Sequence, residues 1–411
     1  MILIGIDWKD KGYTVRIIDE QGSDLSGYFE IEKDEEGFSE LIQKIREYSN
    51  DDSEVLIGIE KERDPLVEYL INLGFNVFLV CPNMIKSLRK RHSISGQYTD
   101  ELDSYVIADA VRTDRKRLTE IEPRNEKIRE IEFLMRHRDK AVDDKRRLTS
   151  RLTAYIKEYF PAFLNFFDNI TCPTALAFLK AYPTYGDIKK LSREEIRTFL
   201  GEHSYYSKSG LLRINKAIER GQVKVDSTVI RERSRSALFI IERIEMLNEE
   251  INAYESKLEE VTEKDKDAEV FSSIPGAGNT LTPGLMVVFG KKRSRYEAPG
   301  EINSLSGMVP LTKQSGNWKS HLFRFGCNHY YRDILTRLAF CSITKSEWAR
   351  SYYNRKRGEG KSHYHALRCL GRLWVKVAFA LWKKREKYDE DKHLAAVQRH
   401  RMGNIPTRKS A

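Results

Sequence analysis

Two short apolar runs, each followed by an acidic residue, constrain the fold of this chain more than any other feature. Residues 2–6 lead directly into Asp7, and residues 55–59 lead into Glu60. Apolar runs of this length are typical of strands buried inside a sheet. A carboxylate at the end of a buried strand is costly unless a cation offsets its charge. The two runs therefore predict a buried sheet with a charged site at its strand ends.

Two further acids extend this candidate site. Asp100 and Asp103 are three residues apart at the start of a helical pattern, so both project from one helical face. Four carboxylates would form an oxygen-rich ligand set, which suits Mg²⁺ or Mn²⁺. We therefore predict a metal site made of Asp7, Glu60, Asp100 and Asp103.

Each acid also has a structural interpretation that the sequence leaves open. Asp7 could cap a turn, Glu60 could be a helix-entry residue, Asp100 could be a helix N-cap, and Asp103 could be an exposed charge on a helix. Asp109 lies on the opposite side of the same helix from Asp100, so we leave it outside the site.

The first 113 residues show an alternation of strands and helices. Strands are predicted at 2–7, 13–18, 26–31, 54–60 and 77–80, and helices at 36–49, 65–73, 82–92 and 100–113. Three strands in a meander, then helix, strand, helix, strand and helix, is the order of the ribonuclease-H-like α/β fold. In that fold the first strand, the fourth strand and a late helix bring carboxylates together.

The middle of the chain is predicted to be helical. Residues 125–160 are charged and helical in pattern, and prolines divide 161–235 into short helices. A heptad repeat follows, with apolar residues at Ala237, Ile240, Ile244, Leu247, Ile251, Tyr254, Leu258 and Val261. Apolar spacing of this kind predicts a coiled coil, either with the 125–160 helix or between protomers. The alternative is an ordinary amphipathic helix on a globular body.

Length and composition limit the class of protein. A chain of 411 residues predicts two or three domains, and 40% hydrophobic with 32% charged residues predicts a soluble protein. No apolar run approaches the roughly 20 residues needed to span a bilayer, and we expect no signal peptide. The five cysteines form no C-x-x-C pair, which argues against structural zinc or disulfides and favours a reducing cytoplasm.

Positive charge is concentrated in the last third of the chain. Residues 291–411 hold 27 Lys and Arg against 9 Asp and Glu, a net charge of +18, whereas residues 1–290 carry a net −8. Aromatic residues are interleaved with this charge, a mixture that suits nucleic-acid backbone contact and base stacking. The alternative is a basic surface on a metabolic enzyme. The basic tail after 382 is expected to be partly disordered or to order on RNA.

These features together resemble a known family. The motif from Tyr98 to Asp103, with Asp7 and Glu60, is similar to the DEDD, RuvC-like transposases of insertion sequence one-hundred-and-ten type, which are related to the Piv/MooV DNA invertases. The C-terminal resemblance runs from the Ile274-Pro275-Gly276 turn through Gly307-Met308-Val309-Pro310, Gln314-Ser315-Gly316 and Arg324 to Asn328, Tyr331 and Leu335.

The resemblance implies a function. It implies a bridge-RNA-guided DNA recombinase of an insertion sequence, which pairs its RNA with donor and target DNA. It also implies that Ser315 attacks the DNA and forms a phosphoserine link, with Mg²⁺ or Mn²⁺ held by the four acids. Gly316-Asn317-Trp318 replaces the family's usual small residues, so Ser304, Ser306 and Ser320 remain rival nucleophiles.

The resemblance also divides the chain and suggests its partners. It implies a RuvC-like catalytic domain at 1–120, a coiled-coil region at 121–268, a mainly α-helical transposase domain at 269–385 and a basic tail at 386–411. We expect a homodimer or homotetramer without membrane contact, in the cytoplasm of a bacterium or archaeon and associated with the nucleoid. The predicted nucleic-acid contacts are Lys313, Lys319, Arg324, Arg355, Lys356 and Arg357.

Two other functions remain open from the sequence. One is a metal-dependent nuclease or junction resolvase that uses water as nucleophile, with Ser315 purely structural. The other is a non-catalytic RNA-binding scaffold whose acids hold a structural metal.

Overall fold

The chain forms two compact units in a computed structural model, which describes residues 1–92, 99–121, 125–316 and 318–395. The N-terminal unit is Met1–Arg124 and the C-terminal unit is Asn125–Ala411. Most of the predicted basic tail, residues 396–411, lies outside the described residues, as does Tyr98 of the acidic motif.

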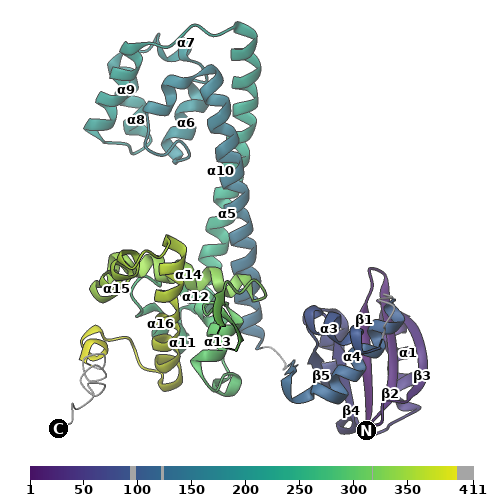
Figure 1. Cartoon of the computed structure of the whole chain (residues 1–411). Coiled ribbons are helices and arrows are strands. Elements are labelled where there is room, and N and C mark those ends of the chain that lie inside the picture. The colour runs from purple at the N-terminus through teal and green to yellow at the C-terminus, as the bar shows by residue number, and fades with distance from the viewer. Residues whose placement is uncertain (93–98, 122–124, 317, 396–411) are drawn as a thin grey trace, which may run out of the picture. The chain divides into compact units, whose positions relative to one another are not determined.

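The N-terminal unit is built on a mixed six-stranded sheet in the order β3-β2-β1-β4-β5-β6 (Figure 1). The strands are β1 (Ile2–Trp8), β2 (Gly12–Asp19), β3 (Asp24–Glu32), β4 (Val55–Ile59), β5 (Asn76–Leu79) and β6 (Thr119–Glu120). β1 pairs antiparallel with β2 and parallel with β4. The predicted mixed α/β order is therefore confirmed. Only the two-residue β6 was missed, because it is too short to show a period.

Four helices cover the two faces of this sheet. They are α1 (Glu35–Arg46), α2 (Pro65–Asn72), α3 (Pro82–His92) and α4 (Asp100–Asp114). Apolar side chains of α1 and α2 share one core with the sheet, whereas α3 and α4 share another. Asp34, Asp64 and Thr99 cap α1, α2 and α4 by accepting backbone N–H bonds, which stops each helix from starting earlier.

The C-terminal unit is organised around two long helices, α5 (Glu126–Tyr159) and α10 (Ser227–Thr262). Arg138 pairs with Glu255, and Arg233 pairs with Glu158, so the two helices run antiparallel. The heptad residues Ile244 and Ile251 are buried. Ile244 shares a core with Ile156 of α5, and Leu258 shares one with Ile131, so this part of the predicted apolar seam packs against α5 of the same chain.

Each end of this helical pair carries its own core. One end supports a helical lobe of residues 161–220, with α6 (Pro173–Ala181), α7 (Tyr185–Ile188), α8 (Arg193–Glu202) and α9 (Lys208–Arg220). The other end supports a C-terminal body of residues 266–384 (Figure 1). α5 contributes Ile131 to the second core and Ile156 to the first, which explains how a single pair of helices holds both.

The C-terminal body is mainly helical, as predicted, and includes one hairpin. Its helices are α11 (Lys266–Ser272), α12 (Gly278–Phe289), α13 (Pro299–Leu305), α14 (His329–Lys345), α15 (Glu347–Gly358) and α16 (His363–Lys384). The hairpin joins β7 (Leu311–Ser315) to β8 (Trp318–Leu322). None of the helices in the described part of the chain is long and apolar enough to cross a membrane.

The glycine turn between α11 and α12 has a packing explanation. Gly276 has φ of +87°, and a Cβ at this position would lie 2.7 Å from the backbone of Cys341 in α14. Glycine is therefore required because the turn adopts a left-handed conformation directly against another helix.

Candidate active site

Two glycines allow α4 to lie directly on the sheet. Gly5 and Gly58 are opposite each other in the parallel β1–β4 register. A Cβ on Gly5 would overlap the Ser104 carbonyl oxygen of α4, and a Cβ on Gly58 would lie 2.8 Å from Ile107. The absence of these two side chains therefore sets the close approach of the helix to the sheet.

The same two strands carry the first two predicted acids. Side chains alternate between the faces of a strand, so Asp7 lies on the face of Gly5, two residues earlier. Glu60 is likewise two residues beyond Gly58 and directly follows β4. Asp100 and Asp103 lie in the first turn of α4, one turn before the contact with Gly5. The glycines thus allow the first turn of α4 to lie close to the ends of the strands that lead into Asp7 and Glu60.

The four acids interact electrostatically. Burial, followed by the carboxylates of Asp103, Glu60 and Asp100 in that order of effect, raises the pKa of Asp7 from 3.8 to about 7, while Arg89 acts to lower it. Asp7 is only 6% exposed. Like charges near a buried carboxyl favour its protonated form. The cluster therefore holds more negative charge than its surroundings compensate.

Two cations that the sequence analysis did not single out partly offset this charge. Arg89 of α3 bonds both carboxylate oxygens of Asp103, and Lys9 Nζ lies 3.3 Å from Asp100. The basic run at the end of α3, which continues to His92, was a usable signal for the first of these. Lys9 is two residues beyond Asp7, but no spacing rule pairs it with Asp100.

The structure decides between several of the alternative roles. Asp7 lies within β1 and is not a turn cap. Thr99, not Asp100, caps α4 by accepting the Leu102 N–H at 3.2 Å. Asp103 is 8% exposed, so it is not an exposed helix charge.

Asp109 belongs to a separate ion cluster on α4. It is fully buried, and its carboxylate oxygens lie 2.6 Å from Arg112 and 2.9 Å from His92 Nε2. Asp109 therefore has local partners, consistent with its exclusion from the predicted site.

The carboxylates fit a divalent cation in chemistry. An oxygen-only set with unbalanced negative charge suits Mg²⁺ or Mn²⁺. As they stand, no three His, Cys, Asp or Glu side chains among the described residues are placed to hold one ion together. Arg89 and Lys9 occupy two of the four carboxylates, so a bound cation would have to compete with these side chains.

Ser315 lies at the end of β7, at the tip of the exposed hairpin. It pairs with Trp318 across the hairpin, and the following Gly316 has φ of +54°, in the left-handed region. Residue 317 lies outside the described residues. Lys313 and Lys319 lie on the two strands of the hairpin, and both are exposed.

The rival serines differ in accessibility. Ser306 is fully buried and donates to the Ile302 carbonyl at 2.6 Å, which leaves it no access to a substrate. Ser304 in α13 and Ser320 in β8 are half-buried. Ser315 is the exposed one of the four serines.

The other predicted nucleic-acid contacts lie elsewhere in the C-terminal body. Arg355, Lys356 and Arg357 form the last turn of α15, where Lys356 Nζ lies 2.7 Å from Glu359 and Arg357 donates to the Lys361 carbonyl at 2.7 Å. Arg324 is half-buried just after the hairpin.

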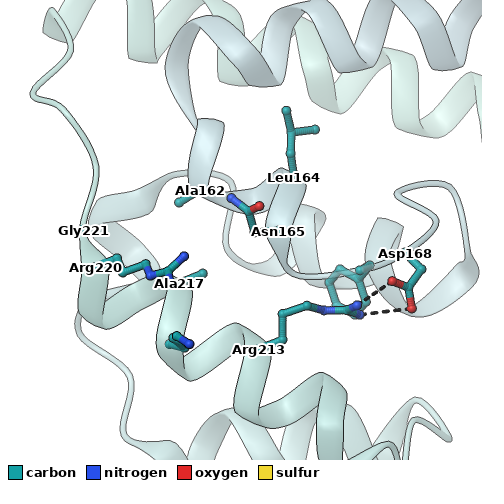
Figure 2. Close-up of a pocket in the computed structure, with 10 residues that line it drawn as sticks. Ala162, Leu164, Asn165, Asp168, Arg213, Ala217, Arg220 and Gly221 are labelled. Atoms are coloured by element: carbon teal, nitrogen blue, oxygen red, sulfur yellow. Dashed lines mark hydrogen bonds and ion pairs between the residues drawn. The ribbon is translucent and has the colours of Figure 1, made fainter.

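A polar pocket of about 580 Å³ occurs in the helical lobe (Figure 2). Arg213, Lys216 and Arg220 of α9 line it, and Figure 2 shows Arg213 directed towards Asp168, at 2.5 Å. It contains none of the residues predicted for the active site.

Comparisons with known proteins point to transposases. A family model described as "Transposase", for the DEDD transposases of IS110 elements, matches residues 4–161. A second, described as "Transposase IS116/IS110/IS902 family", matches residues 268–354. The "Mini-circle putative transposase for IS117" of Streptomyces coelicolor is 25% identical over 409 residues, which cover 96% of this chain and 97% of that protein. The IS116 insertion-element protein of Streptomyces clavuligerus is 25% identical over 359 residues, covering 82% and 88%.

The chain combines an acidic cluster at the strand ends of an α/β sheet with a C-terminal region that a transposase model matches. These features identify its class as that of the DNA transposases. Within that class, the chain belongs to the IS110 family of insertion-sequence transposases.

Proposed function

We propose that this transposase is an RNA-guided DNA recombinase that cuts and rejoins DNA through a phosphoserine intermediate. The observation that carries the proposal is that the carboxylates of Asp103, Glu60 and Asp100, together with burial, raise the pKa of Asp7. Clusters of carboxylates with perturbed pKa values are characteristic of catalytic sites. The exposed hairpin serine supplies a candidate nucleophile that such a site would need.

The four acids would hold Mg²⁺ or Mn²⁺, which would stabilise negative charge developing on the scissile phosphate. A bound cation would favour the ionised form of Asp7, whose pKa is raised by burial and by the neighbouring carboxylates. Arg89 and Lys9 keep Asp103 and Asp100 in place while no cation is present.

Ser315 would attack the phosphorus atom through its Oγ. A P–O bond to serine forms as one P–O bond to deoxyribose breaks, the serine proton is released, and the departing sugar oxygen takes up a proton. The phosphodiester is exchanged for a phosphoserine ester, so the reverse attack by another DNA end can rejoin the strand. A serine hydroxyl needs activation for this step. The two Lys residues of the hairpin would neutralise phosphate charge beside it.

Because the acids and Ser315 belong to different units, we propose that two protomers complete each active site. The assembly would be a dimer or tetramer that acts on donor and target DNA in the cytoplasm, at the nucleoid. The α5–α10 pair would act as a coiled coil that spaces the helical lobe from the C-terminal body.

Mixed variants test this proposal. Asp7→Asn and Ser315→Ala should each abolish strand exchange on donor and target DNA. A mixture of the two should recover activity, because a mixed dimer contains one site with intact acids and an intact serine. No recovery in mixtures of variants that exchange subunits would place both residues in one protomer. Full activity of either variant alone would remove that residue from the mechanism.

RNA guidance has its own test. Protein purified from a host that carries the complete element should retain an RNA of defined sequence, and removal of this RNA should abolish site-specific exchange. Retained activity after nuclease treatment would contradict guidance.

A metal-dependent nuclease remains the second candidate function, since a metal held by the acidic cluster would activate water as the nucleophile without any serine. It predicts free DNA ends and activity without Ser315.

A further inference from the structure

Three arginines surround the segment that follows the hairpin. Arg332 of α14 and Arg368 of α16 place their guanidinium carbons 4.6 and 4.7 Å from the centre of the Phe323 ring. Arg324 is the next residue after Phe323, and Arg332 donates to its carbonyl oxygen. We call Arg324, Arg332 and Arg368 the arginine cradle.

The charge of the cradle is not balanced within the described part of the chain. Burial, followed by the nearby Arg332 guanidinium, lowers the pKa of Arg368. Arg324 and Arg332 both act on the Cys327 thiol, so they lie close to each other as well. No ion pair from any of the three cations to a carboxylate is found among the described residues.

Part of the cradle is also short of hydrogen-bond acceptors. Arg324 Nε is buried and has no partner among the described residues. Arg332 uses two of its nitrogens on the backbone carbonyls of Ser306 and Arg324, which fixes its direction. Contact with an aromatic face offsets only a small part of the cost of a desolvated cation. An arrangement of this kind is stabilised when an anion binds.

An exposed aromatic ring adjoins the cradle. Phe325 is 73% exposed and packs edge-on against Phe323, with ring centroids 4.8 Å apart. Exposed rings next to cations are typical of sites that stack a base and bind its phosphate. Guanidinium groups bind phosphate through paired N–H bonds, which lysine cannot reproduce.

The cradle is separate from the candidate nucleophile. Leu311 pairs with Leu322 at the base of the hairpin, directly before Phe323, and Ser315 lies four residues further along β7. Four residues of strand span about 14 Å. A phosphate in the cradle is therefore not the phosphate that Ser315 would attack.

We propose that the arginine cradle and Phe325 form an anchoring site for the sugar-phosphate backbone of a single nucleic-acid strand, which holds one phosphate while an adjacent base stacks on Phe325. This site adds strand binding to the proposed recombinase function. It rests on that function only for the identity of the strand that is bound. It contributes binding and takes no part in the chemical step.

The test measures binding of the full chain, without divalent metal, to a labelled single-stranded DNA and to an RNA of the same sequence. Arg368→Gln should weaken binding about tenfold, the loss expected for one charge-assisted hydrogen bond. Arg372→Gln is the matched control, because it removes the same charge from an exposed position one turn further along α16. Equal losses of affinity in the two variants, or no loss in Arg368→Gln, would contradict the assignment of the arginine cradle as a binding site.

Two further variants separate shape from charge and test stacking. Arg368→Lys keeps the charge but not the forked geometry, so it should bind between wild type and Arg368→Gln. Phe325→Ala should weaken binding to a normal strand and not to an abasic one, whereas Phe340→Ala, at a 54% exposed position of α14, should affect neither. Equal losses of affinity for Phe325→Ala on both strands would overturn the stacking part.

The DNA and RNA arms identify the strand. A loss of affinity confined to DNA assigns the cradle to a DNA strand, and a loss confined to RNA assigns it to the RNA. Because the assay measures binding alone, these results stand even if Ser315 proves not to be the nucleophile. Conversely, an adduct on Ser315 with unchanged Arg368→Gln binding would sustain the proposed function and reject the cradle.

Discussion

At the scale of single residues, the balance of charge around Asp7 explains most of the expected behaviour of the site. Asp7 is buried among like charges, whereas Asp103 is bonded to Arg89. Two aspartates in one cluster should therefore respond to the same substitution in opposite ways.

Asp7→Asn should stabilise the metal-free protein. The folded-state pKa of about 7 exceeds the unfolded value of 3.8, so the folded protein binds more protons between these values. The free energy of unfolding should thus fall as pH rises from about 4 to 7, by at most about 4 kcal/mol. Urea denaturation across this range should show that fall in wild type and a flatter profile in Asp7→Asn. An identical slope in both proteins would mean that Asp7 is ionised normally.

Asp103→Asn should destabilise the protein by about 1–3 kcal/mol, because it leaves the Arg89 guanidinium without its carboxylate. From the sequence alone, neutralising any of the four acids should leave the metal-free protein at least as stable as wild type. The Arg89 pair changes this expectation for Asp103. A melting temperature at or above that of wild type would show that Arg89 finds another partner.

At the scale of elements, the sequence predicted most of the N-terminal unit because its strands and helices have strong local signals. The buried strands β1 and β4 are continuous apolar runs, and Asp34 and Asp64 mark helix starts. The role of Gly5 and Gly58 was not apparent, since a glycine in a strand reveals nothing about the helix above it. Arg89 and Lys9 were missed for the same reason, because their partners depend on tertiary contacts.

Gly5→Ala should separate α4 from the sheet. The new Cβ would overlap the Ser104 carbonyl oxygen, and overpacking of this kind costs about 1–3 kcal/mol. Displacing α4 also moves Asp100 and Asp103 away from Asp7, so catalysis should fall more than stability does. Gly300→Ala is a suitable control, because a Cβ there meets nothing within 4 Å. Thermal denaturation and strand-exchange assays would check both effects, and a Gly5→Ala protein with wild-type values for both would contradict the packing argument.

At the scale of the whole molecule, the heptad joins α5 and α10 within one chain, and its disruption should appear as unfolding. The double substitution Ile244→Asp and Ile251→Asp would bury charges in this pair and should cost several kcal/mol. Circular dichroism should report reduced helix content, whereas Ala253→Asp on the exposed side of α10 should leave it unchanged. A fully helical double variant that elutes as a smaller species would instead place the seam between protomers.

Positive charge on the hairpin should set part of the salt dependence of nucleic-acid binding. Replacing Lys313 and Lys319 with Gln should lower the slope of log affinity against log salt by roughly one unit for each phosphate that is no longer neutralised. Lys356 is already paired with Glu359, so Lys356→Gln should change the slope less. Equal slopes for wild type and the hairpin variant would remove both lysines from the interface.

The phosphoserine mechanism is tested most directly by trapping the protein on a nicked DNA substrate and mapping any covalent link after a denaturing gel. We expect a protein–DNA adduct through Ser315, which is absent in Ser315→Ala while RNA and DNA binding are retained. An adduct on Ser304 or Ser320 would move the nucleophile within the same mechanism. Cleavage by Ser315→Ala that leaves free DNA ends, with no adduct on any serine, would contradict the phosphoserine mechanism and establish a hydrolytic nuclease.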